Sequence, residues 1–176
     1  LFTPFSIGNV TLKNRFAMAP MGPLGLGEAD GGFNQRGIDY YTERAKGGTG
    51  LIITGVTFVD NEVEEHGMPN CPSPTWNSVH FTRTAREMTE RIHAYGSKIF
   101  LQMSAGFGRV TIPTNLGEYP PVAPSAIPHR WLDKTCRPLT VDEIHKIVKS
   151  FGLGAYNAKR AGFDGVQIHA VHEGYL

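Results

Sequence analysis

The sequence predicts an α/β fold in which strands and helices alternate along the chain and the strands form a parallel sheet. Three amphipathic segments have apolar residues at helical spacing. Each is followed closely by a short apolar run, and a fourth such run precedes the first helix. The helix-to-strand connections are short, whereas the strand-to-helix connections are long. This β-α-β-α-β-α-β order is typical of right-handed βαβ units on a parallel sheet.

The first half of this order is a strand, a helix and a second strand. The expected strand Arg15–Ala19 precedes a helix of modest periodicity. Gly47 and Gly48 end that helix, because glycine readily adopts the conformations that terminate a helix. The second strand, Gly50–Thr54, follows directly. The apolar face of the helix consists of Ile38, Tyr41 and Ala45.

The second half repeats the arrangement twice. One helix ends at Gly96 and is followed by the strand Lys98–Met103. The next begins with the T-x-x-E capping box of Thr140 and Glu143, and the strand Gly165–Ala170 follows it. The apolar face of the helix that ends at Gly96 consists of Phe81, Ala85, Met88, Ile92 and Tyr95. The apolar face of the helix that begins with the capping box consists of Val141, Ile144, Val148, Phe151, Ala155 and Ala158, and Gly162 ends that helix.

Composition excludes several classes of protein. The 17 basic and 16 acidic residues give a net charge of +1, so nothing indicates a nucleic-acid partner or an anionic membrane. No apolar run reaches the length of about 18 residues needed for a membrane span. The N-terminal segment lacks the basic and apolar regions of a secretory signal.

The cysteines and the chain ends give two further expectations. Cys71 and Cys136 are too few for a disulfide framework or for the roughly four ligands of an iron–sulfur cluster, and a reducing, cytoplasmic setting is expected. The chain starts at Leu1 without a methionine and stops at Leu176 soon after an apolar segment. We therefore expect a piece of a longer protein.

The long connections predict where the functional site lies. The segment 104–138 alone carries six prolines, and loops of this length in a compact domain are usually functional or disordered. In parallel α/β proteins, the loops at the carboxyl ends of the strands build the site. These ends carry small residues, one amide (Gln102) and two imidazoles (His169 and His172), with Glu173 as the single acid. Such a set is poorly suited to hydrolysis and suits a planar, uncharged heterocycle.

The residues alone leave the individual roles open. Gln102 can donate and accept at once, which matches the pyrimidine edge of a flavin, but a strand-end amide can also bond to the backbone. His169 and His172 fit a pair of donors to a substrate oxygen, a metal site without an obvious third ligand, or two histidines that simply pack at the mouth of a barrel. Tyr175 is a candidate proton donor or a packing residue.

Two glycine-rich segments invite a phosphate-binding interpretation. They are Gly25–Gly32 and Gly106–Arg109. Neither is followed by Gly-Lys-Ser/Thr, so neither is a P-loop.

Four motifs together give the chain a specific resemblance. They are LKNRFAMAPM (12–21), GGTGLIITG (47–55), KIFLQMSAGFGR (98–109) and AGFDGVQIHAVHEGYL (161–176). The chain resembles the N-terminal half of the Old Yellow Enzyme family of flavin-dependent (β/α)₈ TIM barrels over nearly its whole length. It is most similar to the branch with clostridial 2-enoate reductases and 2,4-dienoyl-CoA reductases.

The resemblance implies an FMN site on this chain. The first-strand turn that faces the flavin matches Ala19, Pro20, Met21 and Gly22. Val56 falls where the family places a small residue beside the isoalloxazine, and Gln102 matches the glutamine that bonds the pyrimidine edge.

The resemblance also implies catalytic residues. His169 and His172 match the His-x-x-His/Asn pair that binds the activating carbonyl or carboxylate of the substrate, and Tyr175 matches a tyrosine that protonates the alkene. The chain departs from many members in two places. Ser104-Ala105-Gly106 follows Gln102-Met103 where many have a histidine, and two residues instead of one separate His172 from Tyr175.

The activity implied is reduction of a carbon–carbon double bond in a 2-enoate or an enoyl or dienoyl thioester, with electrons from NADH. The family further implies a domain at 1–176 that is a partial FMN-binding barrel of four strands. The remainder of the barrel, an FAD/NADH module and a [4Fe–4S] module would lie beyond it. A homo-oligomer is a further expectation. The rival readings are a metal-dependent barrel hydrolase using His169 and His172, and a non-catalytic barrel remnant.

Overall fold

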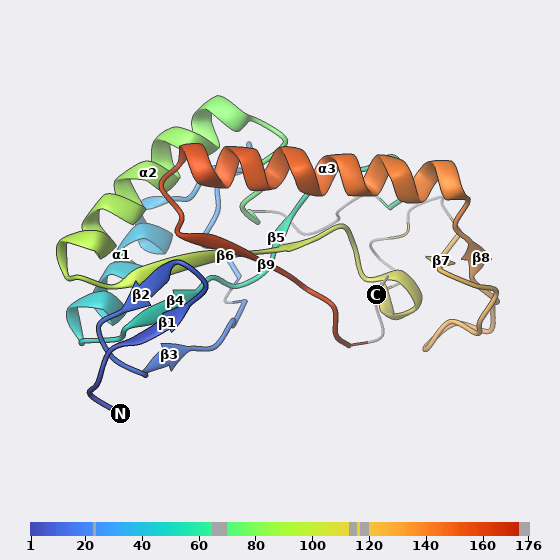
Figure 1. Ribbon diagram of the computed structural model, residues 1–176. Helices are drawn as coiled ribbons and strands as arrows, with labels where there is room; N and C mark the ends of the chain where they lie inside the picture. Colours follow the sequence, from blue (N-terminus) through green and yellow to red (C-terminus); the bar gives the residue numbers. More distant parts are fainter. Residues whose placement is uncertain (23, 65–69, 113–115, 117–119, 173–176) are drawn as a thin grey trace.

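The protein is an α/β structure in which helices cover one face of a parallel sheet (Figure 1). The computed structural model describes residues 1–22, 24–64, 70–112, 116 and 120–172. The main strands are β3 (Ala17–Met18), β4 (Leu51–Ile53), β6 (Lys98–Ser104) and β9 (Gly165–Ile168). Each pairs in parallel with the next, so the strand order follows the chain order. This order, with the helices on one face, is that of a (β/α)₈ barrel and confirms the predicted fold class.

The helices agree with the predicted segments. Among the described residues they are α1 (Gln35–Lys46), α2 (Ser78–Ala94) and α3 (Val141–Arg160). The capping box of Thr140 and Glu143 is present at the start of α3. Asn34 and Asn77 cap the other two helices through their side chains, because asparagine can accept a hydrogen bond from a free N–H of the first turn.

Several short elements add to the predicted order. A hairpin of β1 (Phe5–Ile7) and β2 (Val10–Leu12) precedes the sheet. Beyond a kink after β4, β5 (Thr57–Phe58) pairs with the last residues of β6. Within the segment 104–138 lie a 3₁₀ turn η1 (Gly108–Val110) and β7 (Val122–Ala123). The latter pairs with β8 (Arg137–Pro138).

The hydrophobic core lies between the helices and one face of the sheet. On β6, Ile99, Leu101 and Met103 point into this core and are fully buried, beside Phe81 and Ile92 of α2. Because side chains alternate along a strand, the opposite face of β6 carries Phe100, Gln102 and Ser104. That face is the inward face of a barrel.

Asp164 joins three elements at the amino ends of β6 and β9. Its carboxylate accepts hydrogen bonds from the Ile99 N–H (2.9 Å) and from His93 Nε2 (2.8 Å), and Lys98 Nζ lies 2.9 Å away. Burial alone would raise the pKa of Asp164, but these bonds outweigh it and lower the pKa below its usual value. The cluster fixes the end of the sheet opposite the predicted site.

Apolar side chains remain exposed along α3 and β9. Ile144, Val148 and Phe151 of α3 line an open apolar groove together with Ile168 of β9. A contiguous row of exposed apolar side chains of this kind can serve as an interface. None of the described helices is both long and apolar enough to cross a membrane.

Candidate active site

The carboxyl ends of the parallel strands meet at one edge of the sheet, as the sequence predicts. The turn after β3 contains Ala19, Pro20, Met21 and Gly22, and all four are exposed. Gly55, in the kink after β4, lies directly against this turn. A Cβ atom at Gly55 would lie 2.3 Å from the Met21 carbonyl oxygen and 2.7 Å from the Gly22 Cα. Only glycine therefore lets the two turns touch.

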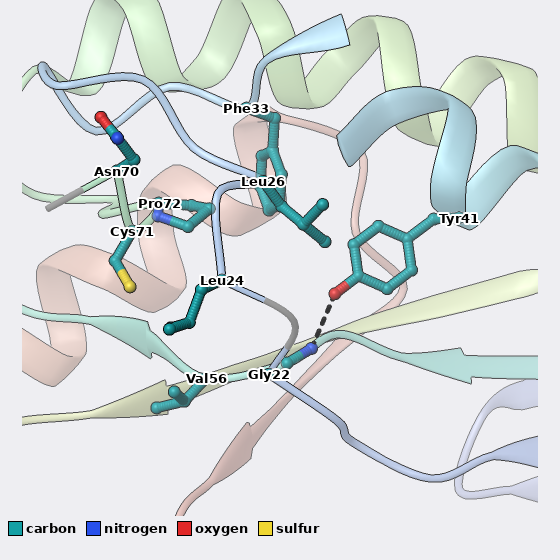
Figure 2. A pocket seen from close by; sticks show the side chains of 10 residues that line it. Gly22, Leu24, Leu26, Phe33, Tyr41, Val56, Asn70, Cys71 and Pro72 are labelled. Carbon is teal, nitrogen blue, oxygen red and sulfur yellow. Dashed lines mark hydrogen bonds between the residues drawn. The ribbon is translucent and has the colours of Figure 1, made fainter. Parts of the chain in front are cut away.

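Tyr41 holds the kink after β4 in place (Figure 2). Its hydroxyl oxygen accepts a hydrogen bond from the Gly55 N–H at 2.8 Å, and the side chain is 2% exposed. Burial raises the pKa of Tyr41 to about 12, so the phenol stays neutral. Sequence reasoning placed Tyr41 only on an apolar helix face. The signal it missed is that a buried tyrosine hydroxyl normally has a hydrogen-bond partner.

A small apolar pocket of about 30 Å³ lies beside these two turns (Figure 2). Gly22 and Val56 line it, and the thiol of Cys71 lies among the apolar side chains around it. Burial raises the pKa of the Cys71 thiol, which keeps it protonated. The remaining described lining includes Leu24, Leu26 and Phe33.

Gln102 lies on the inward face of β6 and is 7% exposed. Its Nε2 donates to Oε1 of Gln167 on β9 at 2.8 Å. Its backbone N–H donates to the Thr54 hydroxyl (3.0 Å), and the Thr57 hydroxyl donates to its carbonyl oxygen (2.8 Å). The side chain therefore bonds to another side chain, and its Oε1 has no partner among the described residues.

His169 and His172 lie side by side at the end of β9. His169 Nε2 and His172 Nδ1 are 3.2 Å apart, and the His169 N–H extends the strand pairing by donating to the Met103 carbonyl. Burial, then the proximity of His172, lowers the pKa of His169, so its imidazole is neutral at neutral pH. His172 adopts a left-handed backbone conformation with φ of 65°, which is uncommon for a residue other than glycine. Tyr175 lies outside the described residues.

A three-residue group of metal-ligand type occurs elsewhere, at Glu28, Asp30 and His80. His80 Nε2 lies 2.6 Å from the Glu28 carboxylate, and Arg83 donates to His80 Nδ1 at 2.9 Å. The Arg83 bond leaves the imidazole proton on Nε2, where it is donated to Glu28. These hydrogen bonds therefore link the loop that contains Glu28 and Asp30 to helix α2. Among the described residues no third ligand of this kind joins His169 and His172.

The glycine-rich segment after β6 binds a carboxylate of the chain itself. The Phe107 and Gly108 N–H groups donate to the two oxygens of Glu64 at 2.9 and 3.0 Å, and the Thr111 hydroxyl donates at 2.7 Å. Glu64 is 4% exposed. The backbone donors that could have bound a phosphate are thus already used, in agreement with the absence of a P-loop motif.

The parallel strands follow the chain order, the helices cover one face of the sheet, and Gln102, Gln167 and His169 lie on the opposite, inward face; together these features define a (β/α)₈-type fold with polar side chains at the carboxyl ends of its strands. The chain belongs to the NADH:flavin oxidoreductase / NADH oxidase family, whose profile matches residues 1–176. The predicted resemblance to Old Yellow Enzymes is therefore confirmed.

Individual relatives agree with this assignment. The chain is 60% identical over 177 residues to a cinnamate reductase of Clostridium sporogenes and 39% identical over 176 residues to an NADH oxidase of Thermoanaerobacter brockii. It is covered completely in both cases but spans only 26% of each relative. The solved Old Yellow Enzyme homologue of Zymomonas mobilis matches with a TM-score of 0.79 and 33% identity. That match covers 99% of this chain and 49% of the homologue.

Proposed function

We propose that residues 1–176 belong to an enzyme that reduces an activated carbon–carbon double bond with FMN as cofactor and NADH as electron donor. The observation that carries this proposal is the inward face of β6 and β9. There Gln102 presents a free amide oxygen, and His169 lies farther along the same face of the strand pair. Family membership and the 60% identity to a cinnamate reductase support the same chemistry.

The residues present fit FMN. A flavin ring is planar and uncharged, and its pyrimidine edge carries an N–H donor between carbonyl acceptors. Gln102 offers a buried amide to that edge, Gly22 and Val56 offer small surfaces, and Ala19, Pro20 and Met21 complete the exposed first turn. When bound, reduced FMN supplies a hydride.

His169 and His172 are proposed to bind the activating oxygen of the substrate. Both facing nitrogens must then donate, so the substrate oxygen replaces the bond that they make to each other at 3.2 Å. Negative charge that develops on this oxygen is stabilised by the two donors, as in an oxyanion hole. Tyr175, three residues beyond His172, is the proposed proton donor to the alkene carbon next to the activating group.

The domain organisation is also a proposal. Residues 1–176 would form the first four strands of the barrel, and a helix that follows β9 would cover the apolar groove of α3 and β9. The support is that the chain spans 49% of the Zymomonas barrel and leaves this apolar surface exposed. The proposal further includes an FAD/NADH module and a [4Fe–4S] cluster in another part of the protein. It also includes a cytoplasmic location and a homo-oligomeric state.

Flavin analysis of the purified enzyme tests the function against the metal-dependent alternative. We expect a yellow protein with stoichiometric FMN, bleached by NADH and restored by a 2-enoate such as cinnamate, with rates unchanged by a chelator. A colourless protein whose activity disappears with the chelator would replace this proposal with the metal-dependent hydrolase.

A further inference from the structure

We propose that Gln167 is a positioning residue that sets the orientation of the Gln102 amide toward the flavin. The inference deepens the proposed function and rests on it. Among the described residues, the Gln167 side chain makes no hydrogen bond to His169, His172 or the first-strand turn. It acts through its bond to Gln102.

The strand pairing brings the two amides together. β6 and β9 are parallel, with Gln102 opposite Gln167 in register, so both side chains lie on the inward face. One pair earlier, Phe100 lies opposite Gly165, where a Cβ would come 2.8 Å from the Phe100 ring. Glycine at this position leaves room for the Phe100 ring next to the two amides.

The backbone of Gln102 is fixed on both sides. Thr54 accepts from its N–H and Thr57 donates to its carbonyl, and both threonines are buried. The main chain therefore cannot adjust to a ligand. The orientation of the side-chain amide is the remaining freedom.

The hydrogen bond to Gln167 couples the orientation of the Gln102 amide to that of Gln167. Gln167 Oε1 accepts from Gln102 Nε2, which leaves Gln102 with its Oε1 and its second N–H for a ligand. These two groups match a ligand edge with an N–H donor beside a carbonyl acceptor, as the pyrimidine edge of a flavin has. A flipped Gln102 would place two oxygens against each other unless Gln167 also turned.

Two substitutions at Gln167 distinguish positioning from packing. Gln167→Glu keeps only acceptors, so it still forces Gln102 to donate. Gln167→Met keeps the length of the side chain and removes the acceptor. A packing role predicts that Met is tolerated and the half-buried carboxylate is not, whereas a positioning role predicts the reverse order.

The test measures FMN binding by fluorescence quenching as each apoenzyme is reconstituted, with the visible flavin spectrum as second readout. We expect Gln167→Met to weaken FMN binding about ten-fold, the effect of losing about one hydrogen bond, and Gln167→Glu to stay closer to the parent. Val166→Ala is the matched control. It alters the same strand on its outer face and should leave FMN affinity unchanged.

The outcomes separate the two proposals. A parent enzyme that binds no FMN overturns the proposed function. A parent that binds FMN, with Gln167→Met equal to it or tighter than Gln167→Glu, overturns the positioning role and leaves the function standing.

Discussion

Replacing His169 or His172 with alanine is expected to slow reoxidation of the reduced flavin by the enoate about a hundred-fold or more. Loss of one donor to a developing oxyanion typically costs roughly 2.7–4 kcal/mol of transition-state stabilisation. Stopped-flow absorbance of the flavin measures this step directly. Reduction of the flavin by NADH should be unchanged, because neither histidine lies among the residues proposed to hold the cofactor.

The matched control for this prediction is His172→Asn. An asparagine amide still donates a hydrogen bond, so this variant should keep much more of the rate than His172→Ala. Nearly unchanged reoxidation by the double variant His169→Ala/His172→Ala would show that the pair does not bind the activating oxygen.

Replacing Glu64 with alanine is expected to destabilise the segment after β6 by about 3 kcal/mol or more. The substitution leaves the Phe107 N–H, the Gly108 N–H and the Thr111 hydroxyl without their buried acceptor, and each unsatisfied buried donor costs roughly 1–3 kcal/mol. Denaturant unfolding of the enzyme and hydrogen exchange of the 107–108 amides measure the loss.

Glu62→Ala serves as the control for Glu64. Its carboxylate is exposed and pairs with Lys146 at the surface, so its removal should change stability little. Equal stabilities of the two variants would mean that the Glu64 contacts contribute nothing beyond a surface charge.

The elements of the fold could be predicted because they depend on local patterns. The capping box that begins at Thr140 and the glycines that end α1 and α2 can each be recognised from a few consecutive residues. The hairpin β1–β2 was not predicted, since short exposed strands lack a clear period. Three of the four predicted strands are shorter than expected, as with Ala17–Met18 inside Arg15–Ala19, whereas β6 extends one residue beyond its predicted end.

The contacts within the candidate site depend on residues far apart in the sequence, and these were not predicted. Gln102 meets Gln167 only through the register of β6 and β9, and Glu64 meets Gly108 only when two long loops close on each other. Residue types indicate that such polar groups need partners, but only the strand register and the loop path identify which ones. The roles of Ala19, Pro20, Met21, Gly22, Val56, Gln102, His169, His172 and Tyr175 remain predictions.

We propose that residues 1–176 carry the flavin-facing and substrate-facing surface of an ene-reducing barrel. A chimera in which this chain replaces the matching 177 residues of the Clostridium sporogenes cinnamate reductase tests this proposal. The measurement is stopped-flow reoxidation of the reduced chimera by cinnamate. We predict that the chimera contains stoichiometric FMN and is reoxidised by cinnamate, and that His169→Ala/His172→Ala abolishes this reoxidation while FMN stays bound. A chimera that unfolds cooperatively but holds no FMN, or whose flavin is not reoxidised by cinnamate, would show that residues 1–176 do not carry this surface.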